Sequence, residues 1–184
     1  MHQSSFEKVI GFKDKHLNNS DNLRIVDLCG LSVKDMSTKE IFNEKKWEHE
    51  ILNIKNVGWH NKIKDGSIDA VVTAQSIERV IEFWLFLNEI ERMLCPGGYL
   101  CIIAASAGAY AESGDFYRFH PEALKGLAEL NGLEVLECII DQKSNWHETT
   151  LIAKKPGVKE KEKVEEVIVD EVKTKSWKRK QKED

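Results

Sequence analysis

The hydrophobic pattern changes twice along residues 65–103, and the changes predict a strand, a helix and a second strand. Residues 68–73 form a mostly apolar run, as expected for a parallel strand buried on both faces. A helical spacing then begins at Ile77. Its apolar positions are Ile77, Val80, Ile81, Trp84, Leu87, Ile90, Met93 and Leu94. The Pro-Gly-Gly sequence at 96–98 ends this helix, because proline cannot extend it and glycine accepts a positive φ. Residues 99–104 form the second strand, and the long crossover predicts that the two strands are parallel.

The N-terminal part of the chain predicts two further strands. Residues 23–30 have the pattern of a buried strand and the turn that leaves it, and residues 47–54 form a strand with some alternation. Residues 37–46 have a helical composition, and a short helix is expected near residues 6–12. Residues 55–64 are irregular, so a third strand there would be a stub at most.

The C-terminal part predicts one helix and a closing hairpin. Residues 121–130 form a helix with proline in its first turn. Residues 133–140 and 149–154 form two strands, for which a hairpin is the simplest arrangement. Strands that alternate with helices predict an α/β fold with a mostly parallel sheet. We expect one domain over residues 1–155, followed by a charged tail over residues 156–184 that is disordered or loosely helical.

Composition narrows the functional classes. With 184 residues, 41% of them hydrophobic, the chain can bury one core of moderate size. A formal net charge of −4 argues against nucleic-acid binding driven by phosphate neutralisation. The four cysteines lack CxxC spacing and the six histidines form no metal motif, so we expect reduced thiols and no metal. Without an apolar signal core or a membrane-spanning run, a cytoplasmic location is expected. The oligomeric state stays open.

Residues 65–98 carry a resemblance to a known family. They combine an Asp-Gly-Ser strand start, a glutamate after the strand, a tryptophan-bearing helix and a Leu-x-Pro-Gly-Gly turn. The matching residues are Asp65, Gly66, Ser67, Asp69, Glu78, Val80, Arg92, Leu94, Pro96, Gly97 and Gly98. This stretch resembles the second half of a class I S-adenosylmethionine-dependent methyltransferase of the type 11-like kind, with Arg79 in place of the usual histidine. The resemblance implies a three-layer Rossmann-like fold with a C-terminal antiparallel hairpin.

The loop and helix after residue 105 are similar to one subgroup of that family, which often accompanies glycan-building enzymes. The matching residues are Ser106, Ala107, Gly108, Asp115, Tyr117, Arg118, Phe119, Pro121 and Leu124. The resemblance covers residues 65–155 well and residues 23–64 poorly. It implies that Tyr117, Arg118 and His120 face the acceptor molecule. An aromatic segment that enters a helix can equally serve as a packing anchor, so both interpretations stay open.

The resemblance also implies where S-adenosylmethionine would bind. The family has Asp-x-Gly-x-Gly after its first strand, and this chain keeps Asp27 and Gly30 but has Cys29 in place of the first glycine. The second strand ends in Asn53 where an acidic residue usually accepts the ribose hydroxyls. The cofactor's sulfonium end would face the segment that leaves the strand over residues 68–73. Its first residues are Thr73, Ala74 and Gln75.

Two residues are candidates for chemistry on the acceptor. Glu78 either contacts the acceptor or only caps the following helix, where negative charge is favoured in any case. An oxygen acceptor needs a base, and His120 is the nearby side chain of a type that takes up a proton near neutral pH.

Three functional hypotheses follow. The first is a methyltransferase that uses S-adenosylmethionine and acts on a small molecule or a saccharide. The second is a degenerate methyltransferase fold that binds a partner or ligand without catalysis, as Cys29, Asn53 and the absent third strand suggest. The third is a nicotinamide-binding protein, which lacks support because no GxGxxG follows the first strand.

Overall fold

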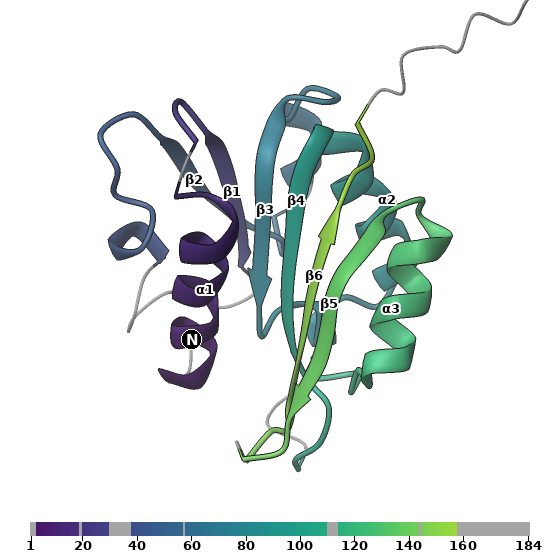
Figure 1. The fold of residues 1–184 in the computed structure, drawn as a ribbon. Coiled ribbons are helices and arrows are strands. Elements are labelled where there is room, and N and C mark those ends of the chain that lie inside the picture. The colour runs from purple at the N-terminus through teal and green to yellow at the C-terminus, as the bar shows by residue number, and fades with distance from the viewer. Residues whose placement is uncertain are drawn as a thin grey trace, which may run out of the picture.

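A six-stranded sheet in the order β2-β1-β3-β4-β6-β5 forms the centre of the protein (Figure 1). The structure is a computed structural model, and it describes residues 3–18, 20–29, 38–56, 58–109, 114–143 and 145–157. Neighbouring strands from β2 to β4 are parallel, whereas β6 is antiparallel to both β4 and β5. The expected α/β fold with a mostly parallel sheet and a C-terminal antiparallel hairpin is therefore confirmed.

The elements follow the expected order along the chain. The strands are β1 (Arg24–Cys29), β2 (Glu48–Asn53), β3 (Ile68–Ala74), β4 (Leu94–Ala105), β5 (Glu134–Asp141) and β6 (Glu148–Lys154). The α-helices are α1 (Gln3–His16), α2 (Phe83–Met93) and α3 (Pro121–Leu130). Three short 3-10 helices are η1 (Thr38–Glu40), η2 (Trp59–Lys62) and η3 (Ile77–Arg79). In the described part of residues 55–64 there is no strand, as expected.

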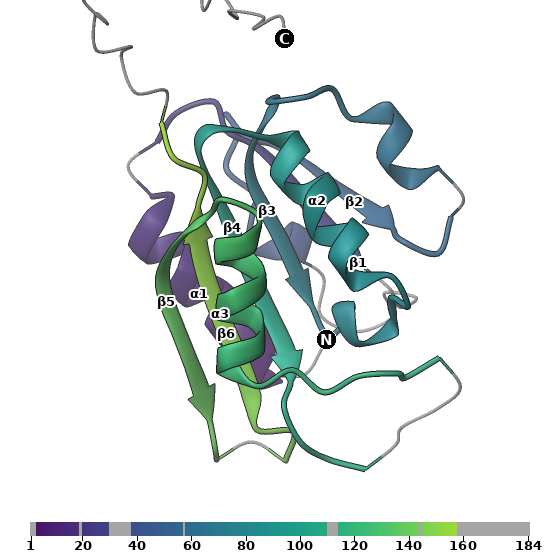
Figure 2. The same cartoon turned by 90° about the vertical axis from the view of Figure 1, so that its right-hand side faces the viewer.

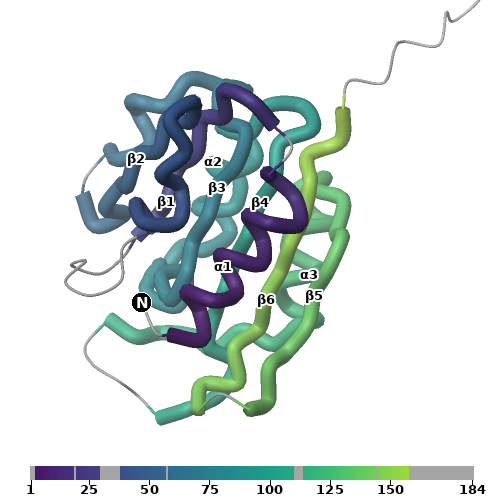
Figure 3. Tube along the Cα trace, turned by 60° about the vertical axis from the view of Figure 1, so that its left-hand side comes forward, coloured from purple at the N-terminus to yellow at the C-terminus, as the bar shows by residue number. Residues whose placement is uncertain are grey.

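Helices cover both faces of the sheet and make three layers. α1 lies on one face, and α2 and α3 lie on the other (Figures 1 and 2). A tube view shows α1 running across β4 and β6 (Figure 3). The α1 face buries Val9 and Phe12 of the helix against strand residues such as Val72. The opposite face buries a larger cluster that includes Leu87 of α2 and Leu124 of α3. Burying a side chain of this size contributes roughly 1.5–3 kcal/mol.

The helix expected from Ile77 onward is shorter than its apolar spacing predicts. Residues 77–79 form η3, Val80 is extended, and α2 begins only at Phe83. Ile77 is fully buried, whereas Ile81 is 59% exposed, so they do not share one buried helical face. The reason is tertiary: Ile77 packs in the core, and the buried Glu78 side chain accepts a hydrogen bond from the backbone of Ala105 in β4. The helix does end before the Pro-Gly-Gly sequence, but β4 already begins at Leu94.

Other boundaries also differ from the sequence prediction. The prediction of a helix over residues 37–46 is wrong for the described residues 38–46. Only η1 is helical there, and the other residues form turns or irregular backbone. The N-terminal helix is longer than residues 6–12. Of the tail expected at 156–184, residues 158–184 lie outside the described residues. None of the four cysteines forms a disulfide in the structure. Within the described ranges, none of the helices combines the length and apolarity that a bilayer crossing requires.

Candidate functional site

The carboxyl ends of β1 to β4 meet at one edge of the sheet, as their parallel register requires (Figure 1). Cys29 at the end of β1 pairs with Asn53 at the end of β2. Ala74 at the end of β3 pairs with Ile103, close to the end of β4. In open α/β folds with a parallel sheet, ligands bind beyond the carboxyl ends of the strands. The edge therefore defines the candidate site, and three of the residues predicted for the cofactor lie on it.

Asp27 lies in β1, two residues before Cys29, and is buried in the protein interior. Only 6% of it is exposed, and its Oδ2 accepts a hydrogen bond of 2.5 Å from Oγ1 of Thr38. Burial raises the pKa of Asp27 to about 6, although the hydrogen bond from Thr38 lowers it. Asp27 therefore ties β1 to the residue at which η1 begins. Gly30, the other residue kept from the family motif, lies outside the described residues.

Asn53 and Cys29 form the tips of the first two strands. Asn53 is exposed, and its Oδ1 accepts a hydrogen bond of 2.9 Å from the backbone N–H of Lys55. Cys29 is half-buried beside it. The two residues that differ from the expected cofactor-binding motif thus lie side by side.

The segment that leaves β3 places Thr73, Ala74 and Gln75 in three environments. Thr73 is fully buried, and its Oγ1 has no hydrogen-bond partner among the described residues. Ala74 is half-buried. Gln75 has a φ of 53°, which is costly for a residue other than glycine. Its backbone N–H donates to the Ile103 carbonyl at 2.8 Å, and this bond holds the strained turn at the sheet edge.

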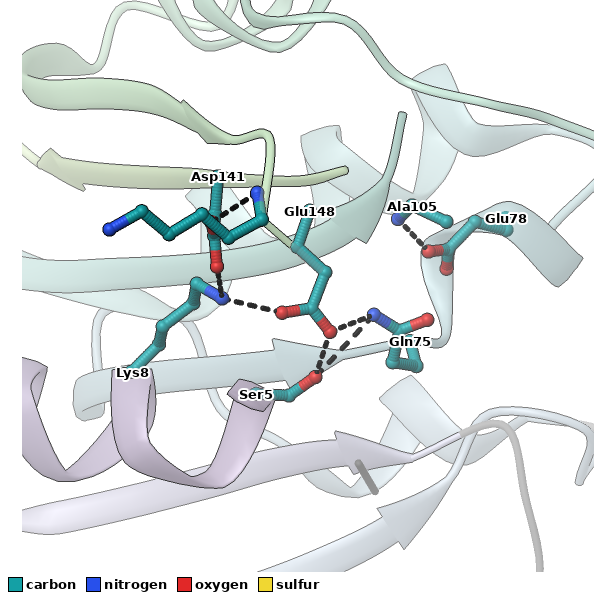
Figure 4. A network of polar contacts seen from close by, with 8 residues as sticks. Ser5, Lys8, Gln75, Glu78, Ala105, Asp141 and Glu148 are labelled. Atoms are coloured by element: carbon teal, nitrogen blue, oxygen red, sulfur yellow. Dashed lines mark hydrogen bonds and ion pairs between the residues drawn. The ribbon is translucent and has the colours of Figure 1, made fainter. Parts of the chain in front are cut away.

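A buried carboxylate network joins this turn to α1, and sequence reasoning did not find it (Figure 4). Glu148 at the start of β6 is fully buried, and its Oε1 accepts hydrogen bonds from Ser5 at 2.5 Å and Gln75 at 2.9 Å. Its Oε2 accepts from Nζ of Lys8 at 2.6 Å. Lys8 also pairs with Asp141 at 3.0 Å. Burial lowers the pKa of Lys8, but the hydrogen bonds to these two carboxylates raise it further, so the net shift is upward. Because Lys8 and Glu148 are 140 positions apart, no local spacing marks them.

Glu78 links the end of β4 to the loop that precedes α3 (Figure 4). Its Oε1 accepts a hydrogen bond of 2.5 Å from the backbone N–H of Ala105, and its own carbonyl accepts from Phe116 at 2.9 Å and Tyr117 at 3.2 Å. Burial raises the pKa of Glu78 to about 7. Its Oε2 is buried without a hydrogen-bond partner in the described part of the chain. The interpretation of Glu78 as a helix cap is wrong, because α2 begins after Glu82.

Tyr117 and Arg118 both make internal contacts. The Tyr117 ring packs against Phe83 at a centroid distance of 5.0 Å, and its hydroxyl donates to the Ile81 carbonyl at 3.0 Å. Arg118 donates two hydrogen bonds to Asp115, at 2.6 and 2.7 Å, and its guanidinium lies 5.6 Å from the Trp146 ring centroid. These contacts support the packing-anchor interpretation of the segment.

His120 is exposed and precedes α3, and its ring contacts the residue that follows β4. Nδ1 of His120 lies 3.2 Å from Oγ of Ser106. The same oxygen lies 2.9 Å from the Phe119 carbonyl and 3.1 Å from Oγ1 of Thr149. The fold therefore brings the start of the loop at residue 106 and its end at residue 120 together. The predicted acceptor residues share this end of the sheet with the predicted cofactor residues.

Comparisons with known proteins agree with this geometry. The family model described as "Methyltransferase domain" matches residues 23–102. The chain is similar to Burkholderia thailandensis 1,6-didemethyltoxoflavin-N1-methyltransferase, solved with 1,6-didemethyltoxoflavin and S-adenosylhomocysteine. That match has a TM-score of 0.65 at 12% identity and covers 84% of this chain and 79% of the other. It is also similar to a SAM-dependent methyltransferase from Aquifex aeolicus, with a TM-score of 0.56 at 14% identity over 84% of this chain and 98% of the other.

The same fold also occurs in a protein named for another reaction. The chain is similar to the cyclase SpnF, with a TM-score of 0.58 at 14% identity over 84% of this chain and 82% of the other. A comparison with curated protein sequences finds no match. At these identities the likeness to solved structures shows the fold, and the methyltransferase-domain match implies S-adenosylmethionine as the cofactor. The sheet topology, the match over residues 23–102 and the structural likeness together give this chain the fold of the class I S-adenosylmethionine-dependent methyltransferases.

Proposed function

We propose that this chain is an S-adenosylmethionine-dependent methyltransferase whose acceptor is a small molecule or a saccharide with hydroxyl groups. One observation carries the proposal. Glu78, Ser106 and His120 come from three separate segments and gather at the end of β4, next to the strand ends where a nucleotide cofactor binds in this fold. The acceptor would lie between this group and the cofactor.

The residues at the strand tips fit the cofactor. Asn53 is exposed and uses one lone pair of its Oδ1 for Lys55, which leaves its amide group able to bind neutral ribose hydroxyls. Cys29 and Ala74 have small side chains, and both are half-buried at the strand ends. Asn53, Cys29 and Gln75 would hold the cofactor. When bound, S-adenosylmethionine supplies an activated methyl group, so the protein's part is mainly alignment.

His120 would take the proton from the acceptor. An oxygen nucleophile must lose its proton as it gains the methyl group, and imidazole is suited to that role near neutral pH. The exposure of His120 allows it to pass the proton on to water.

The saccharide alternative is supported by the resemblance of residues 106–124 to the glycan-associated subgroup. Glu78 and Arg118 attract each other electrostatically beneath this segment. They would therefore hold the segment in place under the acceptor.

Calorimetric titration of the full chain with S-adenosylhomocysteine tests the proposal, with NADH as the control ligand. We expect saturable binding of S-adenosylhomocysteine at one site per chain and no heat from NADH. Incubation with S-adenosylmethionine and a panel of saccharides should then release S-adenosylhomocysteine. Binding of NADH instead would favour a nicotinamide-binding protein. A folded protein that binds neither ligand would refute the proposal.

A second candidate is a binding protein that has lost catalysis. The observation that favours it is the pair Cys29 and Asn53, which replaces a glycine and an acidic residue at adjacent strand tips. Binding of S-adenosylhomocysteine without turnover on any acceptor would support this function. The four free thiols fit a reducing compartment, and we propose the cytoplasm as the place of action for either function.

A further inference from the structure

Two buried hydroxyls lie beneath the ring of His120 and belong to different strands. Ser106 directly follows β4 and is 3% exposed, and Thr149 of β6 is fully buried. Oγ1 of Thr149 donates to Oγ of Ser106 at 3.1 Å, and Oγ of Ser106 donates to the Phe119 carbonyl at 2.9 Å. Nδ1 of His120 is the third neighbour of the Ser106 oxygen, at 3.2 Å.

Counting protons assigns the direction of the contact with His120. A serine hydroxyl has one proton to donate and two lone pairs that accept. The Ser106 proton is committed to the Phe119 carbonyl, and Thr149 fills one of the lone pairs. The remaining lone pair can accept a proton from Nδ1 of His120. If Ser106 turned its proton toward His120 instead, the carbonyl of Phe119, a residue only 3% exposed, would lose its donor, which is unfavourable for a buried acceptor.

We propose that Ser106, supported by Thr149, is a positioning residue that holds His120 in the tautomer with its proton on Nδ1. In that tautomer the lone pair is on Nε2, which has no hydrogen-bond partner among the described residues. Nε2 is then the atom that takes the acceptor's proton, the ring becomes a cation, and water removes the proton afterwards. This inference rests on the proposed function, and it identifies which atom of His120 is the base and why.

The backbone around His120 fixes the ring's position as well as its tautomer. The Phe119 N–H donates to the Ala105 carbonyl at 2.8 Å, so the chain runs along the end of β4. The His120 carbonyl accepts from the N–H groups of Ala123 at 3.0 Å and Leu124 at 3.2 Å in the first turn of α3. Ser106 thus contacts both Phe119 and His120, the last two residues before α3.

Nitrogen-15 NMR of the histidine rings in the full chain tests the inference without cofactor or acceptor. At alkaline pH, where imidazole is neutral, the two ring nitrogens have distinct shifts that report which one carries the proton. We expect the Nδ1–H form to be the majority form of His120 in the natural sequence. In Ser106→Ala the ratio of the Nδ1–H form to the Nε2–H form of His120 should match that of a capped histidine peptide measured alongside, in which Nε2–H predominates.

Thr150→Val is the matched control, because Oγ1 of this neighbouring buried threonine has no hydrogen-bond partner in the described part of the chain. It removes a buried hydroxyl from β6, the strand that carries Thr149, and should leave the His120 tautomer unchanged. A majority of Nε2–H in the natural sequence overturns the inference, whatever the variants do. An equal shift in Ser106→Ala and Thr150→Val also overturns it. If the tautomer is as expected but the protein binds no S-adenosylhomocysteine, the proposed function fails and the positioning of His120 stands.

Discussion

Replacing Glu78 with glutamine should remove a loss of stability that the natural protein suffers as pH rises toward neutral. The Glu78 side chain is 3% exposed, and Oε1 accepts a hydrogen bond from Ala105. Burial raises its pKa from 4.5 to about 7, against a smaller opposite effect of the Ala105 hydrogen bond and of nearby Arg118. The folded protein therefore binds a proton more tightly than the unfolded chain does. Stability falls as pH rises from about 4.5 to about 7, where the folded protein must release that proton.

The size of the effect follows from the shift. One pKa unit corresponds to about 1.4 kcal/mol, so a shift from 4.5 to about 7 makes the ionised form cost roughly 3 kcal/mol. Glutamine cannot ionise, and its carbonyl still accepts from Ala105. Its amide N–H groups replace the unpartnered Oε2, and an unsatisfied buried donor costs about 1 kcal/mol. Glu78→Gln should thus be about 2 kcal/mol more stable than the natural sequence at pH 8, and slightly less stable at pH 4.5.

Urea unfolding at a series of pH values between 4.5 and 8 measures this difference. Glu129→Gln, on the exposed side of α3, makes the same change in net charge and serves as the control. The free energy of unfolding of Glu78→Gln should gain roughly 3 kcal/mol relative to the natural sequence across this range, and that of the control should not. Parallel stability curves for Glu78→Gln and the natural sequence would refute the reasoning, because they would mean that the Glu78 carboxyl has the same pKa in the folded and unfolded chain.

Three further predictions concern the cofactor edge, the α1 network and the domain boundary. Cys29→Gly combined with Asn53→Asp should tighten S-adenosylhomocysteine binding about tenfold or more in calorimetry, and no change would mean that these tips do not contact the cofactor. Lys8→Met should lower the free energy of unfolding by roughly 3 kcal/mol, because it removes the cation that forms an ion pair with the fully buried carboxylate of Glu148. The control is Lys15→Met: the Lys15 side chain is 61% exposed, so its loss should lower the free energy of unfolding by less than about 1 kcal/mol. Equal losses in the two variants would mean that the buried ion pair contributes no more than the exposed one. Limited proteolysis should leave a stable core that ends near Lys155, and earlier cleavage within the sheet would contradict a single domain.

Much of the fold could be predicted because strand and helix patterns are local. The mostly apolar run at 68–73 predicted β3, and the proline in the first turn predicted α3 with the bounds that the structure has. The prediction of α2 was less accurate, since apolar spacing reports burial and cannot tell which element buries each side chain. Ile77 is buried through η3, and Ile81 and Trp84 are partly exposed.

The sequence by itself determined the α/β class, the order of the strands along the chain and the identity of the residues at their carboxyl ends. It also singled out Glu78 and His120, because both lie in local motifs. Only the tertiary structure decided their surroundings: that Glu78 bonds to Ala105, and that the ring of His120 lies on Ser106. The buried network of Lys8 and Glu148 could not be predicted from the sequence. Periodicity records which faces are buried, whereas contacts between residues 140 positions apart depend on how α1 packs on β6, and no local pattern contains that information.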